Sequence, residues 1–533
     1  MGQVNFKAGE FLARLLELTG IKPVLQYRWQ VRCSEVGSFL VYYGVRNYSI
    51  QGRAVLPVST AAGAVLTGLD GVKCWREVIE SIREDKREAV KNELINLYAQ
   101  KIIVDSSDLK SQVTLANKKT CTLCVNNDYI LPGLEFDERG VCAVCQQYEK
   151  NGDGADDPLI TSEDEIMSIV KSHTGSRFEV MVLYTGGKDS SYLLWYLARR
   201  LGLKVLAVTL NMPYMNKAAR QNILAAQKHL PEVDFIERTV SRRVINEAMR
   251  GQLRRVGSPC FCYILASILF YPLAVIEGIP LIMDGIEQVQ RTFITIGAGR
   301  GNPTGGAKSK SDIQLMNETG AVMPYNTATR QYLVRYWNTL GHPLYREDFS
   351  WSSEYIKALA SIKEALAEYY GPFLSVLDKL SDSTPGKNIL LPQIKHLASN
   401  QVYGSWQDVA ELLKREIGWQ MPHGQESLLH TSCYLEEVKD YTQYNMFKNM
   451  RTTLLPQSII EISAAVYHGL ISREEGLREL AARGYLKPPR ALEQLLADLE
   501  IDNEVITEGE MVYALGCGRC PSLDFKIGGD FNQ

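Results

Sequence analysis

The chain has 533 residues, which is too long for a single hydrophobic core, so we expect three or four domains. Its composition, with 45% hydrophobic and 22% charged residues, is that of an ordinary soluble globular protein. The formal net charge of −3 gives no general attraction for nucleic acid, and the sequence has no apolar run of roughly eighteen residues and no signal peptide. We therefore expect a cytoplasmic protein whose partners include neither a membrane nor a nucleic acid.

Residues 1–115 predict an α+β domain of the winged-helix type. Short strands are expected between Val24 and Leu56, and helices follow from Thr60 onward. The piece LDG at residues 69–71, set between two helices, resembles the peptide-recognition domains of ribosomal-peptide modification enzymes, in which a sheet edge binds a leader peptide by strand addition. A packing or dimerisation domain, and with it a homodimer, is the alternative.

Eleven cysteines in a chain expected in the cytoplasm indicate metal sites or reactive thiols rather than disulfides. Three of them stand alone and are expected to be buried apolar side chains: Cys33, Cys74 and Cys433. Residues 117–150 contain two CxxC pairs, separated by seventeen residues: Cys121 with Cys124, and Cys142 with Cys145. Two such pairs close a tetrahedral Zn²⁺ site with no open position, so we predict a structural zinc ribbon.

The segment 177–202 predicts a strand, a glycine turn and a helix. Residues 180–184 are apolar and suit a strand buried in a parallel sheet, and leucines at helical spacing follow from residue 193. Backbone N–H groups at the start of such a helix bind anions, and the glycines let phosphate oxygens approach the main chain. The groups expected to bind phosphate are those of Thr185, Gly186, Gly187, Lys188, Ser190 and Ser191.

A carboxylate at position 189 adds a second requirement. Asp189 would repel a phosphate unless a divalent cation lay between them, so it argues for Mg²⁺ and a pyrophosphate. The run TGGKDSS resembles the SGGxDS signature of the PP-loop ATP pyrophosphatases, with Thr185 in place of the first serine. Members of that superfamily cleave ATP between the α and β phosphates and transfer AMP to a substrate oxygen. Lys188 and Asp189 are our catalytic candidates in this loop.

We assign residues 160–325 to a doubly wound α/β domain with a parallel sheet, of the PP-loop (HUP-like) type. A second buried strand is expected at residues 204–210, so that Thr209 at its end would border the adenine and ribose. A further strand at 279–283 would end in a loop that begins at Asp284. The segment resembles PP-loop enzymes in which a Gly-containing loop borders the reacting groups, and this resemblance implies that Gly285 lies near them. The residues from 297 to 320 predict a mobile loop over the site.

Cys260 and Cys262 precede a helix and are the remaining catalytic candidates. A thiol at a helix N-terminus loses its proton more readily, although inert residues are the alternative. With Cys517 and Cys520, these two cysteines could bind a second metal or an iron–sulfur cluster. Six arginines between residues 238 and 255 form either a solvated helix face or a docking site for a substrate phosphate or RNA.

Residues 326–533 predict a mostly helical region. From about 117 to 480, the order of motifs resembles the N-acetyl sugar amidotransferase family. In the cysteine segment the matching positions are Leu134, Phe136, Asp137, Gly140, Cys142 and Cys145. Near the end they are Gly469, Ile471, Ser472, Arg473, Glu474 and Glu475, where Ser472 and Glu475 would form a capping box.

The resemblance implies adenylation of a carbonyl or carboxylate oxygen of an acceptor, which could be a small molecule or could be bound to a peptide or carrier. A nitrogen nucleophile would then displace AMP. The chain has no glutaminase signature, so the resemblance implies ammonia from a separate glutaminase. Sulfur transfer through Cys260 or Cys262, with a separate sulfur donor, is the first alternative. A catalytically silent scaffold that binds peptide is the second. The cofactors expected are therefore ATP, Mg²⁺ and Zn²⁺, with an iron–sulfur cluster in the sulfur alternative.

Overall fold

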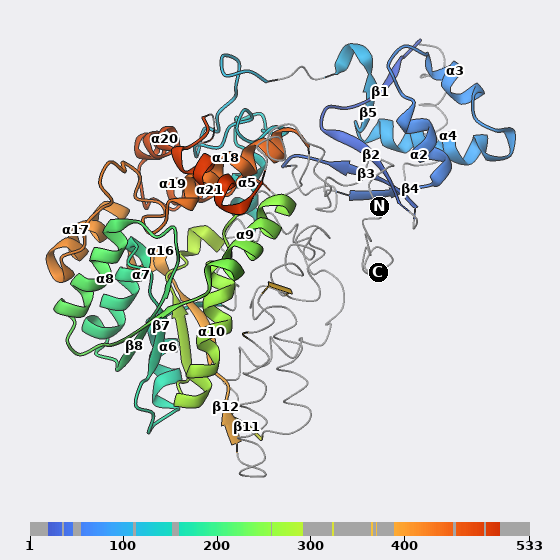
Figure 1. Ribbon diagram of the computed structural model, residues 1–533. Helices are drawn as coiled ribbons and strands as arrows, with labels where there is room; N and C mark the ends of the chain where they lie inside the picture. Colours follow the sequence, from blue (N-terminus) through green and yellow to red (C-terminus); the bar gives the residue numbers. More distant parts are fainter. Residues whose placement is uncertain are drawn as a thin grey trace.

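The computed structural model describes residues 20–34, 37–45, 55–109, 113–151, 159–256, 258–291, 322–324, 364–365, 369, 388–450, 455–483, 485 and 487–501 (Figure 1). Across these ranges the chain is an α/β protein with a central parallel sheet, an N-terminal α+β part and a largely helical C-terminal part. No helix in these ranges is both long and apolar enough to cross a membrane.

The N-terminal part contains two small antiparallel sheets and three α-helices among its described residues. Its elements are β1 (Pro23–Leu25), β2 (Trp29–Ser34), β3 (Gly37–Tyr42), β4 (Val55–Val58), α2 (Thr60–Thr67), α3 (Trp75–Glu80), α4 (Glu84–Ala99), β5 (Ile103–Asp105) and the 3₁₀ turn η1 (Ser106–Asp108). Strands β2, β3 and β4 pair in that order, and β1 pairs with β5. Leu40, Trp75 and Leu94 lie in their shared core. The predicted α+β class is confirmed, whereas the winged-helix assignment stays a prediction.

In the described part of the chain, six strands form the central sheet, in the order β6-β13-β10-β7-β8-β9, and all neighbours are parallel. Its strands are β6 (Ile160–Thr161), β7 (Val180–Leu183), β8 (Val205–Asn211), β9 (Asp234–Thr239), β10 (Leu281–Asp284) and β13 (Gln393–Leu397). The helices between them are α6 (Glu163–Lys171), α7 (Lys188–Trp195), the π-helical turn η2 (Tyr196–Arg200), α8 (Lys217–His229), α9 (Arg242–Val256) and α10 (Cys262–Glu277). This arrangement confirms the predicted doubly wound sheet.

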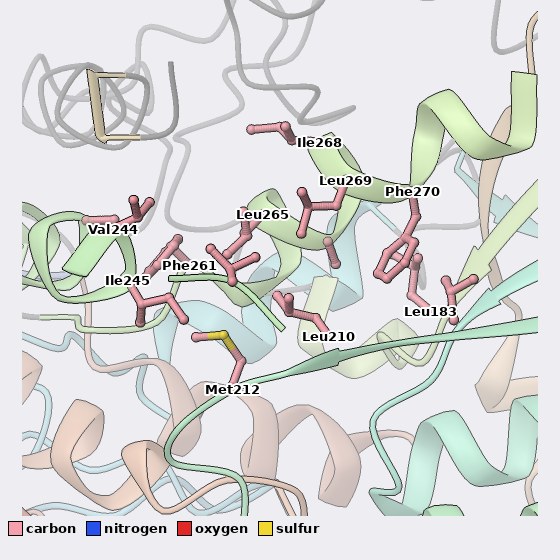
Figure 2. Packing of buried hydrophobic residues seen from close by; sticks show 14 of the residues in the cluster. Leu183, Leu210, Met212, Val244, Ile245, Phe261, Leu265, Ile268, Leu269 and Phe270 are labelled. Atoms are coloured by element: carbon pink, nitrogen blue, oxygen red, sulfur yellow. The ribbon is translucent and has the colours of Figure 1, made fainter. Parts of the chain in front are cut away.

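Each face of the sheet is covered by its own layer of helices. Side chains of α6, α7, α8 and α17 (Trp406–Ile417) form a core with one face, together with Val180 and Val182 of β7. On the opposite face, the helices are α9 and α10, and the core includes Met181 and Leu183 of the same strand. Figure 2 shows Leu183 close to Phe270 of α10 within this second core. The alternation along β7 explains why its sequence is apolar throughout.

The C-terminal part is largely helical, as predicted. Beyond the small antiparallel pair β11 (Val322–Pro324) and β12 (Asn388–Leu390), its helices are α16 (Ser399–Val402), α17, α18 (Leu435–Lys448), α19 (Gln457–Tyr467), α20 (Arg473–Ala482) and α21 (Arg490–Leu499). Ser472 and Glu475 form the expected capping box at the start of α20. The cysteine segment and the helix α5 (Ala143–Asn151) pack with α19 and α20 in one core.

Arg28 joins the N-terminal part to the rest of the chain. Its backbone has a φ of 74°, and its guanidinium donates to the carbonyl oxygens of Phe447 (2.6 Å) and Lys448 (2.7 Å). Both carbonyls lie in the last turn of α18, where a cation is favourable. The Phe447 ring also lies 4.9 Å from the guanidinium carbon.

Three expectations need correction, and others lie outside the described residues. The sheet is not confined to residues 160–325, because β13 from the region predicted as helical is inserted between β6 and β10. Asp284 belongs to strand β10 rather than to the loop, since it pairs with both neighbouring strands. Cys33 is exposed rather than buried. Cys517, Cys520 and the segment 297–320 lie outside the described residues, and the division into four domains stays a prediction.

Candidate active site

The candidate site lies where the strand order of the sheet reverses. The chain runs from β7 to β8 and β9 on one side and then returns to β10 on the other side of β7. In open α/β sheets, ligands bind in the crevice that such a reversal leaves at the carboxyl ends of the strands. Residues 184–187 follow β7 there, and residues 285–288 follow β10. The predicted phosphate loop is therefore positioned at the reversal.

The two glycines of this loop are needed for different reasons. Gly186 has a φ of 73°, and a Cβ on it would collide with the carbonyl oxygen of Ala219. Its own carbonyl oxygen accepts hydrogen bonds from Asn222 Nδ2 (3.0 Å) and Trp419 Nε1 (3.1 Å), which fix the turn. Gly187 is the N-cap residue of α7. The turn is therefore packed closely against α8, and it leads directly into the N-terminus of α7.

Three of the backbone donors of the loop have hydrogen-bond partners within the protein. The N–H of Lys188 donates to Oγ1 of Thr431 (2.8 Å), and the N–H of Thr185 donates to Oγ of Ser190 (3.2 Å). The N–H of Gly187 donates to Oγ1 of Thr185 (3.4 Å). The hydroxyl groups of Thr185 and Ser190 are themselves 3.0 Å apart. A phosphate that used the N–H of Lys188 would therefore have to displace the hydroxyl of Thr431.

The side chain of Lys188 is buried beside two carboxylates. Its ammonium forms ion pairs with Asp189 and with Glu287 Oε1 (2.6 Å), and its side chain is 1% exposed. Trp406 Nε1 donates to the other oxygen of Glu287 (3.1 Å), and the Trp406 ring centroid is 5.0 Å from the ammonium. Burial lowers the pKa of Lys188, but Asp189 and Glu287 outweigh it and the pKa is raised. The ammonium therefore stays charged and points at these carboxylates.

The other predicted site residues are Gly285, Thr209 and Ser191. Gly285 packs against the start of α7, because a Cβ on it would lie 2.5 Å from the backbone nitrogen of Ser190. This contact brings the two loops together, as expected. Thr209 is 1% exposed and donates from its hydroxyl to the carbonyl oxygen of Tyr184 (2.9 Å). Its side chain thus supports the end of β7, and the border with adenine stays a prediction. The Ser191 hydroxyl lies 3.4 Å from the Tyr184 hydroxyl.

Cys260 and Cys262 lie close together at the start of α10. Their sulfur atoms are 3.7 Å apart, and Cys260 Sγ is 4.0 Å from Glu436 Oε1. Neighbouring Cys262 and burial raise the pKa of the Cys260 thiol. This favours the alternative of an inert thiol, because Cys260 lies next to a second thiol and a carboxylate, and its catalytic role stays a prediction. Burial likewise raises the pKa of the Cys433 thiol.

Glu436 belongs to a buried group of charged side chains on α18 and α19. It pairs with Lys439 on its own helix, and His430 Nδ1 is 3.8 Å from its Oε2. His430 Nε2 also lies 2.6 Å from Glu461 Oε2. His430 has a φ of 56° and directly precedes Thr431, whose hydroxyl contacts the phosphate loop. Residues 430 and 431 therefore connect the buried charged side chains with the phosphate loop.

Within the described residues, four cysteines could hold one metal ion. Cys121, Cys124, Cys142 and Cys145 are all buried, and their sulfur atoms lie within 4.8 Å of one another. The N–H groups of Leu123 and Asn126 donate to the sulfur atoms of Cys121 and Cys124, both at 3.4 Å. Such bonds stabilise thiolates, so the residues present fit a four-thiolate metal site. The predicted ligand set is thus brought together.

Arg473, at the start of α20, forms hydrogen bonds with the backbone of the first CxxC pair. Its guanidinium donates to the carbonyl oxygens of Cys121 (3.1 Å) and Cys124 (3.2 Å). The arginine of the sequence SREE and the first CxxC pair are therefore parts of one structure, although 349 residues separate Cys124 from Arg473.

Two arginines of the six-arginine segment attach α9 to α21. Arg242 pairs with Asp498 (2.7 Å), and Arg250 donates to the carbonyl oxygen of Leu499 (2.7 Å). Arg243 pairs with Glu247 on its own helix (3.2 Å) and is 68% exposed, as expected for a solvated helix face. The side chains of Arg254 and Arg255 lie outside the described residues, and the choice between a solvated face and a docking site stays open.

Sequence reasoning missed three residues of the site: Glu287, Trp406 and Thr431. Glu287 had a usable signal, because a carboxylate in the loop after a strand end can meet the lysine of a neighbouring loop. Trp406 and Thr431 had none, since both come from more than two hundred residues downstream of the phosphate loop. Their positions depend on how α17 and the segment before α18 fold back over α7.

Comparison with known proteins gives distant similarities. No family model matches the sequence. The uncharacterized protein MJ1599 of Methanocaldococcus jannaschii is 24% identical over 140 residues, which cover 26% of this chain and 48% of that protein. The chain thus spans about half the length of the curated relative it matches.

Three solved structures are also similar. The U34-tRNA thiolase NcsA from Methanococcus maripaludis with its [4Fe-4S] cluster is 13% identical, covers 42% of this chain and 74% of its own, and has a TM-score of 0.17. The NH3-dependent NAD synthetase from Campylobacter jejuni is 17% identical, with coverages of 42% and 92% and a TM-score of 0.19. A predicted subunit of tRNA methyltransferase from Methanocaldococcus jannaschii is 20% identical, with coverages of 36% and 88% and a TM-score of 0.17.

Proposed function

We propose that this protein uses ATP to adenylate a carbonyl or carboxylate oxygen of an acceptor, releasing pyrophosphate, and that a nitrogen nucleophile then displaces AMP. The position of the Gly186-Gly187 turn carries the proposal. The turn lies at the strand reversal beside β10 and leads directly into the N-terminus of α7, where a pyrophosphate is favoured. The resemblance of TGGKDSS to the PP-loop signature supports adenylation, which makes a poor leaving oxygen part of AMP, a better leaving group.

The charged side chains fit the cation and the nucleotide. Carboxylate oxygens are the ligands that Mg²⁺ prefers, and Asp189 and Glu287 bring two carboxylates to the crevice. Bound Mg²⁺ would neutralise part of the pyrophosphate charge. In the absence of nucleotide, Lys188 supplies the compensating charge for both carboxylates. We propose that Asp189 turns toward the cation while Glu287 keeps Lys188 in place.

Nucleotide turnover tests this function. The full chain with Mg²⁺ and ATP, supplied with ammonium and candidate acceptors such as a sugar acetamide or a peptide amide, should form AMP and pyrophosphate rather than ADP. Asp189→Asn should lose this activity, whereas Asp234→Asn, which removes an exposed carboxylate paired with Arg177, should keep it. A protein that binds no nucleotide would leave only a peptide-binding scaffold. AMP formation that is equal in Asp189→Asn would show that Asp189 is not the residue that orients the cation.

Sulfur transfer remains the second candidate because Cys260 and Cys262 lie 3.7 Å apart. Two sulfur atoms at this distance suit a metal or a persulfide carrier as well as a resting dithiol. Iron, zinc and sulfide should be measured on protein purified without oxygen, with Cys260→Ala as the comparison. Acid-labile sulfide that disappears in the variant would favour sulfur over nitrogen as the transferred atom.

We further propose that the ion of the four-cysteine site is Zn²⁺ and that its role is structural. All four positions of a tetrahedral site are taken by cysteine, so no position is left for a substrate. The site lies in the core formed with α19 and α20 rather than at the strand reversal. Metal analysis should give about one zinc per chain that is retained in Asp189→Asn.

For the N-terminal part we propose peptide capture by strand addition. In the described three-stranded sheet, β2 and β4 are the outer strands, and an outer strand has unpaired backbone groups along one side. A labelled precursor-type peptide should bind residues 1–115 within the full chain. Dimerisation through the same edge is the competing outcome, and it would be seen as a concentration-dependent mass.

A further inference from the structure

Asp284 and His396 form a buried pair that has no role in the adenylation site described above. Nδ1 of His396 lies 2.7 Å from Oδ1 of Asp284, and the two residues are 0% and 3% exposed, respectively. The N–H of Ile286 also donates to Oδ1 of Asp284 (2.9 Å). Among the described residues, Nε2 of His396 and Oδ2 of Asp284 have no hydrogen-bond partner although both atoms are buried. Buried polar atoms are almost always paired, so these two indicate a ligand or an ordered water.

The pair lies at the end of the sheet where the nucleotide is proposed to bind. Asp284 is the last residue of β10 and is in register with His396 of β13 and with Leu183 of β7. The next residue, Gly285, packs against the backbone of Ser190 at the start of α7. Asp284 is therefore one residue away from contact with the phosphate loop. His396 lies on the next strand, on the side away from β7.

Both side chains point to the face of the sheet that α10 covers. Ile282 and Ile394 precede them by two positions on their strands and belong to the core on that face. Lys395 points to the opposite face, where it pairs with Glu165 (2.6 Å). Within the described parts of β10 and β13, Asp284 is thus the charged group that faces the ring of His396.

This geometry gives His396 the properties of a base. When Nδ1 donates its proton to Asp284, Nε2 of the neutral imidazole carries the lone pair. The carboxylate fixes this tautomer and stabilises the imidazolium that forms when Nε2 takes up a proton. The carboxylate satisfies one ring nitrogen, whereas the other ring nitrogen is buried with no partner among the described residues.

We propose that His396, oriented by Asp284, takes the proton of the acceptor as its oxygen attacks ATP. The inference rests on the proposed function. The acceptor oxygen forms a bond to the α-phosphorus, and the bond from that phosphorus to the bridging oxygen breaks, with its electron pair leaving on pyrophosphate. The proton on the attacking oxygen, or on a nitrogen conjugated with it, passes to Nε2. A carboxylate acceptor has no such proton. The pair of His396 and Asp284, called the dyad below, would therefore act on an acceptor that carries a proton on this oxygen or on the conjugated nitrogen.

The location of the dyad can be tested without knowing the acceptor. The full chain, labelled with ¹⁵N in its seven histidines, is titrated with Mg²⁺ and α,β-methylene-ATP, a nucleotide that cannot lose pyrophosphate. The Nε2 signal of His396, assigned by its loss in His396→Gln, should shift as the nucleotide binds. The signal of His423, an exposed residue, should not. Binding seen by calorimetry with no change at His396 would overturn the inference and leave the proposed function intact. Absence of binding would overturn the proposed function, and the inference with it.

The role of the dyad is tested with water in the place of the acceptor. AMP formation from Mg·ATP in water should fall about a hundredfold in His396→Gln, with an unchanged KM for ATP, because a general base acts after binding. Asp284→Asn, which keeps the shape of the pair, should lower kcat and retain the same KM. A variant at either position with a wild-type kcat, or with kcat and KM changed together, would show that the pair is structural. His423→Gln serves as the control for histidine replacement.

Discussion

The ammonium nitrogen of Lys188 lies 2.6 Å from Oε1 of Glu287, and both side chains are 1% exposed. Glu287 is in turn bonded to Trp406 of α17, so one carboxylate joins the phosphate loop, the loop after β10 and a C-terminal helix. The lysine in the loop is therefore held by protein groups before any nucleotide arrives. We infer that the first role of Lys188 is to hold the phosphate loop and the loop after β10 in fixed positions relative to each other.

Removal of the Glu287 carboxylate should destabilise the protein strongly. In Glu287→Ala, a buried ammonium keeps Asp189 as its partner but loses a second one, and Trp406 Nε1 is left without an acceptor. We expect the free energy of unfolding to fall by about 3 kcal/mol, as is typical when one partner of a buried pair is removed. Urea denaturation followed by circular dichroism measures this. Glu416→Ala, which removes an exposed partner of Arg415, should cost less than about 0.5 kcal/mol. Equal effects in the two variants would mean that the buried pair is not important for stability.

Much of the sheet could be predicted from local sequence because its signals are local. The apolar run at residues 180–183 and the glycines that follow it fix a strand, a turn and a helix within about fifteen residues. The strand β13 could not be predicted in the same way. Its sequence, QIKHL, contains a lysine and a histidine, and their partners in the buried sheet, Glu165 and Asp284, come from distant segments. Burial of charged residues depends on partners that periodicity does not reveal.

The contact of Thr431 with the phosphate loop could not be predicted either, because Thr431 comes from a distant segment of the chain. Its hydroxyl accepts a hydrogen bond from the N–H of Lys188 at 2.8 Å. If pyrophosphate uses this N–H, it must first break a hydrogen bond worth about 1 kcal/mol. Thr431→Val, which keeps the shape but removes the hydroxyl, should therefore bind Mg·pyrophosphate about fivefold more tightly. Thr431→Ser should bind like the wild type. Calorimetry with pyrophosphate makes the comparison, and weaker binding by the valine variant would show that the hydroxyl contacts the ligand instead.

Glu436 should give the protein a distinct acid sensitivity. Burial raises its pKa, but His430 and Lys439 outweigh burial and lower the pKa from 4.5 to about 2. A carboxyl group with a lowered folded pKa stabilises the protein above its unfolded pKa, and this contribution is lost as the pH falls toward the folded pKa. The group should therefore contribute about 3 kcal/mol at pH 7, which disappears between about pH 4.5 and pH 2.

Urea denaturation at a series of pH values checks this window. The difference in unfolding free energy between the wild type and Glu436→Gln should be largest at neutral pH and should narrow below about pH 4.5. Glu437→Gln, at the exposed neighbouring position of α18, should follow the wild type throughout. A gap between wild type and Glu436→Gln that stays constant down to pH 2 would show that Glu436 acts through its shape rather than its charge.

Arg473 should control how firmly the four-cysteine site holds its metal. Its guanidinium donates to the carbonyl oxygens of both residues of the first CxxC pair, so it orients the loop that aims their sulfur atoms. Outer partners of this kind typically change metal affinity tenfold to a hundredfold. We expect Arg473→Gln to lose zinc to a chromogenic chelator at concentrations about tenfold lower than the wild type requires. Arg478→Gln on the same helix, where the side chain is 70% exposed, should behave like the wild type. If the two variants release zinc equally, the contact of Arg473 with the cysteine segment serves packing alone, and the metal site depends on its own four thiolates.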